Sequence, residues 1–266
     1  MRVGYIGLGS QGAPMAHRII AAGYETTLWA RRAETLEPFQ GRGATFAATP
    51  AELGSACELV CLCVVNDADV EQVVGELLPA MAAGGVIAVQ STVRPETCLR
   101  LAAAAAERDI TLIDAPVSGG APAAEAGELL VMVGGDAETF ERCKPVFSTY
   151  GNPVVHVGPL GSGQLAKLVN NVLFIAHLGI ANDAYVLGEG LGLDRNALYT
   201  IVSRGSGNSF GLGIMSARTL PEMGALAGTL LRKDLDIVTE VAAERGADGG
   251  SLIDVANDAV ERMEGE

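Results

Sequence analysis

A lysine and an asparagine lie four residues apart in a long apolar stretch, and together they could carry acid–base chemistry. The stretch begins at Gly161 and continues in a helical pattern to Gly188. On a helix, Lys167 and Asn171 would lie on one face, one turn apart. Burial of a lysine in an apolar helix is costly unless a cleft or a partner receives its charge. The alternative is a surface lysine whose apolar stem covers the helix.

A glycine-rich segment near the N-terminus has the pattern of a dinucleotide site. It lies between an expected strand over residues 2–6 and an expected helix that Gly23 stops, and a second strand is expected over 26–29. In such a βαβ unit the glycines permit a tight turn, a close approach to a pyrophosphate, and close packing of helix on strand. We therefore predict a cofactor site, in preference to a structural glycine turn, at Gly7, Leu8, Gly9, Ser10, Gln11 and Gly12.

The second expected strand is followed by two basic residues, Arg31 and Arg32. An NAD-specific site usually places an acidic residue here to bind the ribose 2′-hydroxyl. An arginine can instead hold a 2′-phosphate with a planar pair of donors. The sequence therefore predicts that NADP(H) is preferred over NAD(H). The alternative is that both arginines are solvated surface side chains.

Polar residues follow several further expected strands. The apolar run over 59–65 predicts a buried parallel strand. Further strands are expected over 86–89, 110–113, 129–133 and 154–157. Helices are expected over 95–107 and 137–147. Asp67 is expected to cap the helix after the first of these strands. Ligands of doubly wound sheets bind outside the carboxyl ends of the strands. One crevice could thus be lined by the glycine segment over 7–12 together with Asn66, Ser91, Thr92, Ser118, Gly119 and Gly120.

The pattern changes after residue 160. Strand-like runs disappear, and helical patterns are interrupted by short breaks over 188–194, 205–213 and 246–250. We predict an α/β protein with two domains. Residues 1–160 would form a Rossmann-type, doubly wound and mainly parallel sheet, and residues 161–266 an all-helical domain.

Composition restricts the partners that the chain could have. The 266 residues carry a formal net charge of −14, which argues against binding to nucleic acid or to anionic membranes. Because no apolar run reaches eighteen residues, no membrane span is expected. The five cysteines and three histidines lack metal-ligand spacing, so no metal is expected. Cys61 and Cys63 are expected to be buried strand thiols, which fits a reducing, cytoplasmic setting.

Taken together, these segments resemble the β-hydroxyacid dehydrogenase family, which includes 3-hydroxyisobutyrate and tartronate semialdehyde type dehydrogenases. The resemblance covers nearly the whole chain. Residues 7–16 are similar to the family's N-terminal signature, and residues 114–120, with Ala126 and Gly127, to its substrate motif. Residues 161–171 are similar to its catalytic motif, and residues 233–235 to its C-terminal one.

The resemblance implies roles for individual residues. Lys167 would be the catalytic residue, Asn171 would contact substrate, and Ser118, Gly119 and Gly120 would hold the substrate carboxylate. Cofactor contacts are predicted at Val65, Asn66, Thr92 and Lys233, in addition to the glycine segment and the two arginines. The family's second domain is all-helical, and the resemblance implies a homodimer or a homotetramer.

We therefore expect an oxidoreductase that transfers a hydride between NADP(H) and a small 3-hydroxyacid, or its semialdehyde, with Lys167 as general acid–base. Imine reduction on the same fold is an alternative, although such enzymes generally replace this lysine. A non-catalytic dinucleotide-binding or chromatin-associated module is a second alternative.

Overall fold

The computed structural model describes residues 1–265 and divides into two compact units, Met1–Lys167 and Leu168–Glu266. The boundary expected at residue 160 stays a prediction. Within the described residues, nine strands form one sheet in the first unit. They are β1 (Val3–Ile6), β2 (Thr26–Trp29), β3 (Ala44–Phe46), β4 (Leu59–Leu62), β5 (Val86–Val89), β6 (Thr111–Asp114), β7 (Val117–Ser118), β8 (Leu129–Gly134) and β9 (Gly151–Gly158).

The strand order is β3-β2-β1-β4-β5-β6-β8-β7, with β9 paired to β8. The strands from β3 to β6 pair in parallel, and β8 pairs antiparallel to both β6 and β7. The order reverses at β1, so the loops after β1 and β4 diverge there. This is the switch point at which doubly wound sheets bind ligands. The predicted α/β fold, with its mainly parallel sheet, is confirmed.

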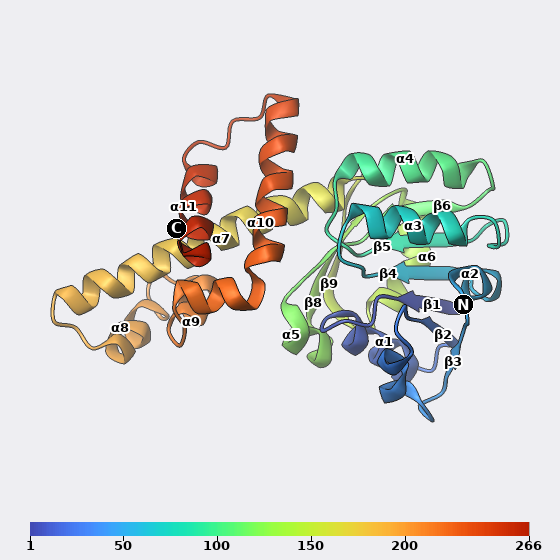
Figure 1. Ribbon diagram of the computed structural model, residues 1–266, viewed down its shortest axis with the longest axis horizontal. Coiled ribbons are helices and arrows are strands. Elements are labelled where there is room, and N and C mark those ends of the chain that lie inside the picture. Colours follow the sequence, from blue (N-terminus) through green and yellow to red (C-terminus); the bar gives the residue numbers. More distant parts are fainter. Residues whose placement is uncertain (266) are drawn as a thin grey trace. The chain divides into compact units, whose positions relative to one another are not determined.

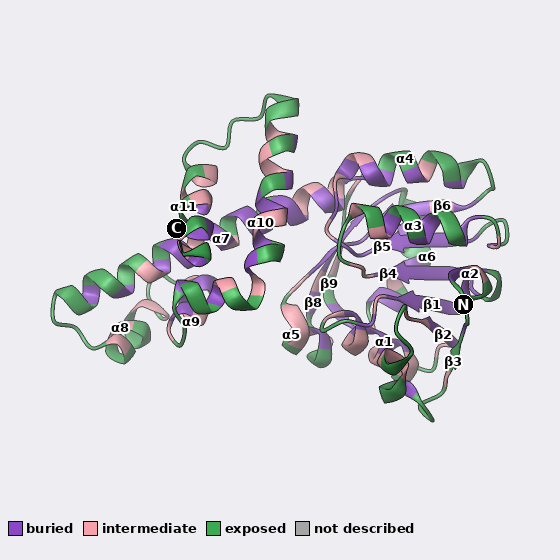
Figure 2. Cartoon of the chain, viewed as in Figure 1, coloured by how far each residue is buried: buried purple, intermediate pink, exposed green. Residues whose placement is uncertain are grey.

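Helices cover both faces of this sheet (Figure 1). On one face lie α1 (Gly12–Ala21), α5 (Gly120–Ala126) and α6 (Ala137–Phe147), and on the other α2 (Pro50–Ala56), α3 (Asp67–Leu77) and α4 (Pro95–Ala106). A 3-10 helix, η1 (Ala33–Phe39), follows β2. Figure 2 shows the central strands β1, β4 and β5 buried along their length, as expected for strands covered on both faces.

Every regular element among the described residues of the second unit is a helix. The long α7 (Ser162–Gly190) begins in the first unit and continues into the second, where α8 (Arg195–Val202), α9 (Phe210–Met215), α10 (Leu220–Arg245) and α11 (Leu252–Glu264) follow. Thr219 and Glu222 form a reciprocal cap at the start of α10. Side chains from α7, α9, α10 and α11 form the core of this unit, including Tyr185, Met215, Leu235 and Val260.

The first turn of α7 lies very close to the sheet. A methyl group added at Gly163 would overlap the carbonyl oxygen of Met132 on β8 and lie 2.8 Å from a carboxylate oxygen of Asp114. A side chain therefore cannot be placed at Gly163 unless the helix moves away from the strands. This close approach fixes the first turn of α7 against β8 and Asp114.

Gly163→Ala should lower the free energy of unfolding by about 1–3 kcal/mol, because overpacking forces the backbone to shift. Gly75→Ala on α3 is the matched control, since a methyl group there has no described atom within 4 Å. The control should gain about 0.5–1 kcal/mol from helix propensity. Denaturant unfolding of both variants measures the contrast. A Gly163→Ala protein as stable as the Gly75→Ala protein would show that α7 can be displaced without cost.

Candidate active site

The glycine segment connects β1 to α1. Gly7 has a φ of +98°, and a side chain there would overlap the backbone of Cys63, just beyond β4. A side chain at Gly12 would overlap the carbonyl oxygen of Gly7. Gly9 is exposed, and a methyl group added to it would have no described atom within 4 Å. The protein thus requires Gly7 and Gly12 for its own packing, whereas Gly9 borders open space.

The start of α1, all of which is described, suits an anion. Gln11 makes no side-chain cap there, and the first turn contains no acidic residue. The first backbone N–H groups of a helix and its dipole attract negative charge. Leu8 is buried, Ser10 is exposed and Gln11 is half-buried. The residues present therefore fit the pyrophosphate of a dinucleotide.

The two arginines after β2 are exposed, and each has an acidic neighbour. Arg31 donates from Nη2 to Oδ1 of Asp69 on α3 at 2.7 Å, and this hydrogen bond raises the pKa of Arg31. Arg32 lies 3.9 Å from a carboxylate oxygen of Glu34. A guanidinium has five N–H donors, so Arg31 keeps others for a further anion. Asp69 was missed by sequence reasoning because it lies 38 residues from Arg31.

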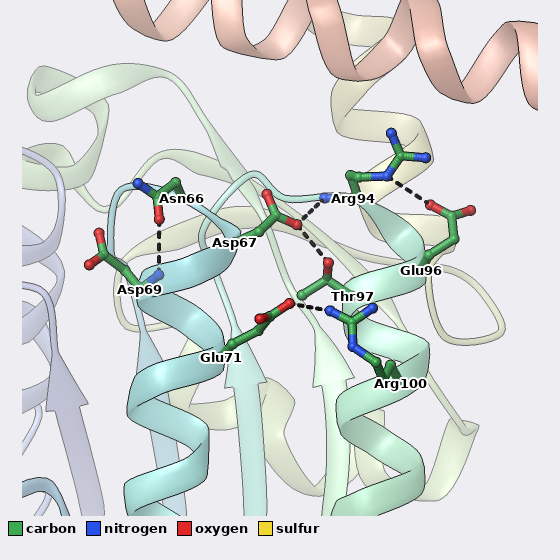
Figure 3. A network of polar contacts seen from close by, with 8 residues as sticks. All are labelled: Asn66, Asp67, Asp69, Glu71, Arg94, Glu96, Thr97 and Arg100. Carbon is green, nitrogen blue, oxygen red and sulfur yellow. Dashed lines mark hydrogen bonds and ion pairs between the residues drawn. The ribbon is translucent and has the colours of Figure 1, made fainter.

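The loop after β4 holds the next two predicted cofactor contacts. Val65 is 60% exposed, and Asn66 is exposed as well. The Asn66 side chain caps α3 by accepting a hydrogen bond from the backbone N–H of Asp69 at 2.9 Å (Figure 3). The exposed apolar side chain of Val65 is available for contact with a ligand.

The expectation that Asp67 caps α3 was wrong. Asn66 has the extended backbone that a capping residue needs, whereas Asp67 is already the first helical residue. Asp67 instead accepts hydrogen bonds from the backbone N–H of Arg94 at 3.0 Å and from the hydroxyl of Thr97 at 2.7 Å (Figure 3). It therefore joins the start of α3 to the start of α4. Glu71 and Arg100 form a second connection between the same helices.

Thr92 lies in the loop between β5 and α4. It is half-buried, and Ser91 beside it accepts a hydrogen bond from the backbone N–H of Val64 at 2.8 Å. The loops after β4 and β5 are thereby tied to each other at the carboxyl edge of the sheet. Among the predicted contacts, the structure therefore brings together the loops that carry Asn66 and Thr92.

The predicted carboxylate-binding segment lies between β7 and α5. Ser118 ends β7 half-buried, and Gly119 and Gly120 have φ values of +130° and +72°. A methyl group on Gly119 would lie 2.6 Å from the methyl group of Ala123, but one on Gly120 would meet only Pro122 at 3.7 Å among described atoms. Gly119 is therefore required by the local fold, whatever its role in binding. The binding role of this segment stays a prediction.

Asp114, at the end of β6, holds the start of α7. Its carboxylate is fully buried and accepts hydrogen bonds from the backbone N–H groups of Gly161 at 2.7 Å and Gln164 at 2.6 Å. Burial raises the pKa of Asp114 to about 6, and these N–H groups act in the opposite direction. The carboxyl is thus ionised at neutral pH, with both oxygens accepting. Its role could not be read from the sequence, because its partners lie 47 and 50 residues away.

Lys167 is buried, with 8% of its surface exposed, and lies in the second turn of α7. Its charge acts on the thiol of Cys63, at the end of β4. Burial raises the pKa of Cys63 to about 11, and both a hydrogen bond with Tyr5 and the charge of Lys167 act to lower this pKa. The lysine is therefore associated with the carboxyl edge of the sheet. This burial argues against an ordinary surface lysine.

Asn171 and Lys233 belong to the second unit, where both contact Asp234. Asn171 donates from Nδ2 to Oδ2 of Asp234 at 2.6 Å, and Lys233 Nζ lies 3.1 Å from Oδ1. Both Asn171 and Asp234 are buried. Because its Nδ2 is engaged, the Asn171 amide has a fixed orientation. Asp234 lies within the C-terminal motif, but the sequence did not reveal its contact with a residue 63 positions away.

The described residues also bear on whether the protein could bind a metal or cross a membrane. Within residues 1–265, no group of three or more His, Cys, Asp or Glu side chains could hold a metal ion. All five cysteines are free, and Cys61 is buried in β4 as expected, but Cys63 lies beyond the strand and is only half-buried. By length and composition α7 could cross a membrane, yet 56% of its most apolar window is buried inside the protein. A buried core helix meets the same criterion, so this is weak evidence for a span.

Two protein families match successive parts of the chain. Residues 2–158 match the family described as the NAD binding domain of 6-phosphogluconate dehydrogenase. Residues 161–263 match the family described as NAD-binding of NADP-dependent 3-hydroxyisobutyrate dehydrogenase.

Similar proteins include two dehydrogenases of small hydroxyacids. The chain is 33% identical to 2-(hydroxymethyl)glutarate dehydrogenase of Eubacterium barkeri, over 92% of this chain and 83% of that protein. It is 34% identical to NAD-dependent L-serine dehydrogenase of Pseudomonas aeruginosa, over 91% of this chain and 85% of that protein.

Two solved structures extend the comparison. The Mycobacterium tuberculosis 3-hydroxyisobutyrate dehydrogenase with L-serine superposes with a TM-score of 0.87 at 25% identity, covering 100% of this chain and 95% of that one. An imine reductase from Pseudomonas sp. superposes with a TM-score of 0.70 at 17% identity, covering 95% and 90%, and shares the fold alone.

Proposed function

The chain belongs to the β-hydroxyacid dehydrogenase family of NAD(P)-dependent enzymes, and from that premise we propose that it transfers a hydride between NADP(H) and a small 3-hydroxyacid or its semialdehyde. The observation that carries this proposal is the buried Lys167. It lies on a helix whose start is bound by Asp114 at the same edge of the sheet as the glycine segment.

The nicotinamide, when bound, supplies the acceptor or donor of the hydride. The segment Gly7 to Gly12 would hold the pyrophosphate of the dinucleotide at the start of α1. The cofactor would also be contacted from the loops after β4 and β5, by Val65, Asn66 and Thr92. The resemblance assigns Lys233 to the cofactor and Asn171 to the substrate, and both assignments are part of the proposal.

Lys167 would move the proton of the reacting oxygen. In oxidation its neutral amine takes the proton of the substrate hydroxyl, and in reduction its ammonium group returns a proton to the carbonyl oxygen. Asn171, one helical turn further along α7, would orient the substrate without changing the charge of the site. Ser118, Gly119 and Gly120 would hold the substrate carboxylate through backbone N–H groups.

Two alternatives are less well supported. Imine reductases share the fold, but the retained and buried Lys167 favours an alcohol or carbonyl substrate. A non-catalytic dinucleotide-binding module would have no use for a buried lysine at this edge of the sheet. Turnover with NADP(H) of small 3-hydroxyacids, semialdehydes and cyclic imines distinguishes the three, and turnover of imines alone would contradict the proposal.

A cytoplasmic location and a homo-oligomeric state complete the proposal. The five reduced cysteines and the partly buried α7 favour a soluble protein in a reducing setting. In the second unit, large apolar side chains are exposed on α7 and α10. They include Val169, Leu173, Ile180, Val186, Leu187, Leu226 and Leu230. Exposed apolar surface of this kind commonly marks a protein interface.

Lys167→Ala should lower kcat by ~10²–10⁴, the usual contribution of general acid–base catalysis. The dissociation constant of NADPH, read from nicotinamide fluorescence, should change little. Lys144→Ala is the matched control, because Lys144 on α6 is half-exposed and pairs with Glu141 on the same helix. Near-normal kcat in Lys167→Ala would remove the lysine from the mechanism.

Arg31→Gln should lower the preference for NADP(H) over NAD(H) in kcat/KM by about ten- to a hundredfold, the worth of a charge-assisted hydrogen bond of roughly 1.5–3 kcal/mol. Glutamine removes the positive charge and avoids placing a second carboxylate beside Asp69. Arg32→Gln is the comparison and should have the smaller effect, because Arg31 is the first basic residue after the strand. Steady-state kinetics with both cofactors measure the ratio. An unchanged ratio in both variants would identify the arginines as surface residues.

The protein should be at least a dimer at micromolar concentration, as measured by light scattering. Leu187→Glu, at a residue 64% exposed on α7, should shift it toward monomer. Leu99→Glu on α4 of the first unit, where the side chain is 48% exposed, should leave the mass unchanged. A monomeric wild-type protein would refute the proposed assembly.

A further inference from the structure

Gln164 is a fully buried amide in the first turn of α7. Its Nε2 donates to the carbonyl oxygen of Ser91 at 2.8 Å, and its Oε1 accepts from the backbone N–H of Val93 at 3.1 Å. Its own backbone N–H donates to Asp114 at 2.6 Å. One residue therefore bonds to the backbone on both sides of Thr92 and to the carboxylate that holds α7.

We propose that Gln164 is a positioning residue that fixes the loop bearing Thr92 against the helix bearing Lys167. Gln164 would thereby set the distance between the cofactor and the acid–base group, so the inference rests on the proposed function. Lys167 lies three residues further along the helix, a rise of about 4.5 Å. A rigid helix transmits any shift of Gln164 to Lys167.

The chemistry of an amide matches this task. A carbonyl and an N–H group two residues apart require one donor and one acceptor from the same side chain, which glutamine supplies. Apolar side chains supply neither group, and a carboxylate would place an oxygen against the Ser91 carbonyl. Other contacts hold the loop from the α3 side, through Asp67 to Arg94 and through Ser91 to Val64. Gln164 adds the connection to α7.

A purely structural role is the competing explanation, and Gln90 provides a matched control. Gln90 is 2% exposed, accepts from the hydroxyl of Tyr5 at 2.7 Å and donates to the hydroxyl of Tyr150. It thus has the same side chain, similar burial and two side-chain hydrogen bonds. Its partners are core tyrosines, however, and not backbone groups of the loop over 91–94. Loss of either amide should destabilise the protein to a similar extent.

The experiment compares Gln164→Met with Gln90→Met in the full chain. In Gln164→Met we expect kcat to fall about 10–100-fold, since small misplacement of reacting groups is costly. The KM and the dissociation constant of NADPH should change by less than about threefold, the pattern of an interaction that matters mainly in the transition state. Gln90→Met should keep kcat within about threefold at a comparable loss of thermal stability.

Hydrogen exchange provides a readout that does not depend on turnover. Amides of residues 91–94 should exchange roughly tenfold faster in Gln164→Met than in Gln90→Met, because local opening becomes easier. If Gln164→Met does not fold, Gln164→Asn replaces it, since its side chain is one methylene too short to reach both groups. The same kcat and exchange changes are then expected.

Three results would overturn the inference. The first is a folded Gln164 variant whose kcat stays within threefold of wild type. The second is a loss of kcat in Gln90→Met as large as that in Gln164→Met. The third is unchanged amide exchange over 91–94. If instead the wild-type protein oxidises no hydroxyacid, the proposed function fails, and the exchange measurement alone decides whether Gln164 holds the loop.

Discussion

The site depends on one buried carboxylate. Asp114 ends β6, and both of its oxygens accept hydrogen bonds from the first backbone N–H groups around the start of α7. Burial of a charge in the protein interior is unfavourable by itself, as the raised pKa of about 6 reflects. The helix N-terminus offsets this cost, because its N–H groups and dipole interact with the negative charge. Where α7 begins, and hence where Lys167 lies, follows from this interaction.

The contact also explains why small residues surround it. Side chains at Gly134 or Gly163 would overlap Asp114 or the backbone beside it. The carboxylate can reach the helix only because neither residue carries a side chain. The glycine-rich lead-in to α7 is therefore a packing requirement as well as a feature of the sequence. This requirement constrains the same helix that carries the proposed acid–base residue.

Local patterns in the sequence predicted seven of the nine strands that the described residues form. The strands over 26–29 and 86–89 were predicted with the bounds that the structure has, because each is a short run of β-branched and apolar residues that begins within three residues of a glycine. The run over 59–65 was predicted too long, since β4 ends at Leu62 and the chain then turns outward until Val65 is exposed. The short β3 and β7 were not predicted, because two or three residues give no readable period.

The polar contacts of the site were beyond the reach of local patterns. Gln164 bonds to groups 71 and 73 residues away, and Asp67 bonds to groups 27 and 30 residues away. No spacing rule relates such residues, because their proximity arises only when the sheet forms. The motif resemblance could name Lys167 and Asn171, but not the side chains that hold their surroundings.

The second unit uses a related arrangement. Asp234 is a buried carboxylate that accepts a hydrogen bond from Asn171 through one oxygen and lies 3.1 Å from the Lys233 ammonium through the other. A buried carboxylate with two such partners is far less costly than an isolated one. Its charge also prevents Asn171 from turning its carbonyl oxygen toward Asp234, since two acceptors would then face each other. Each unit thus has one buried aspartate that orients groups proposed to act in the reaction. Asp114 lies in the same motif as Ser118, Gly119 and Gly120, and Asp234 lies beside Lys233. Each aspartate is therefore a neighbour in sequence of residues that are proposed to bind substrate or cofactor directly.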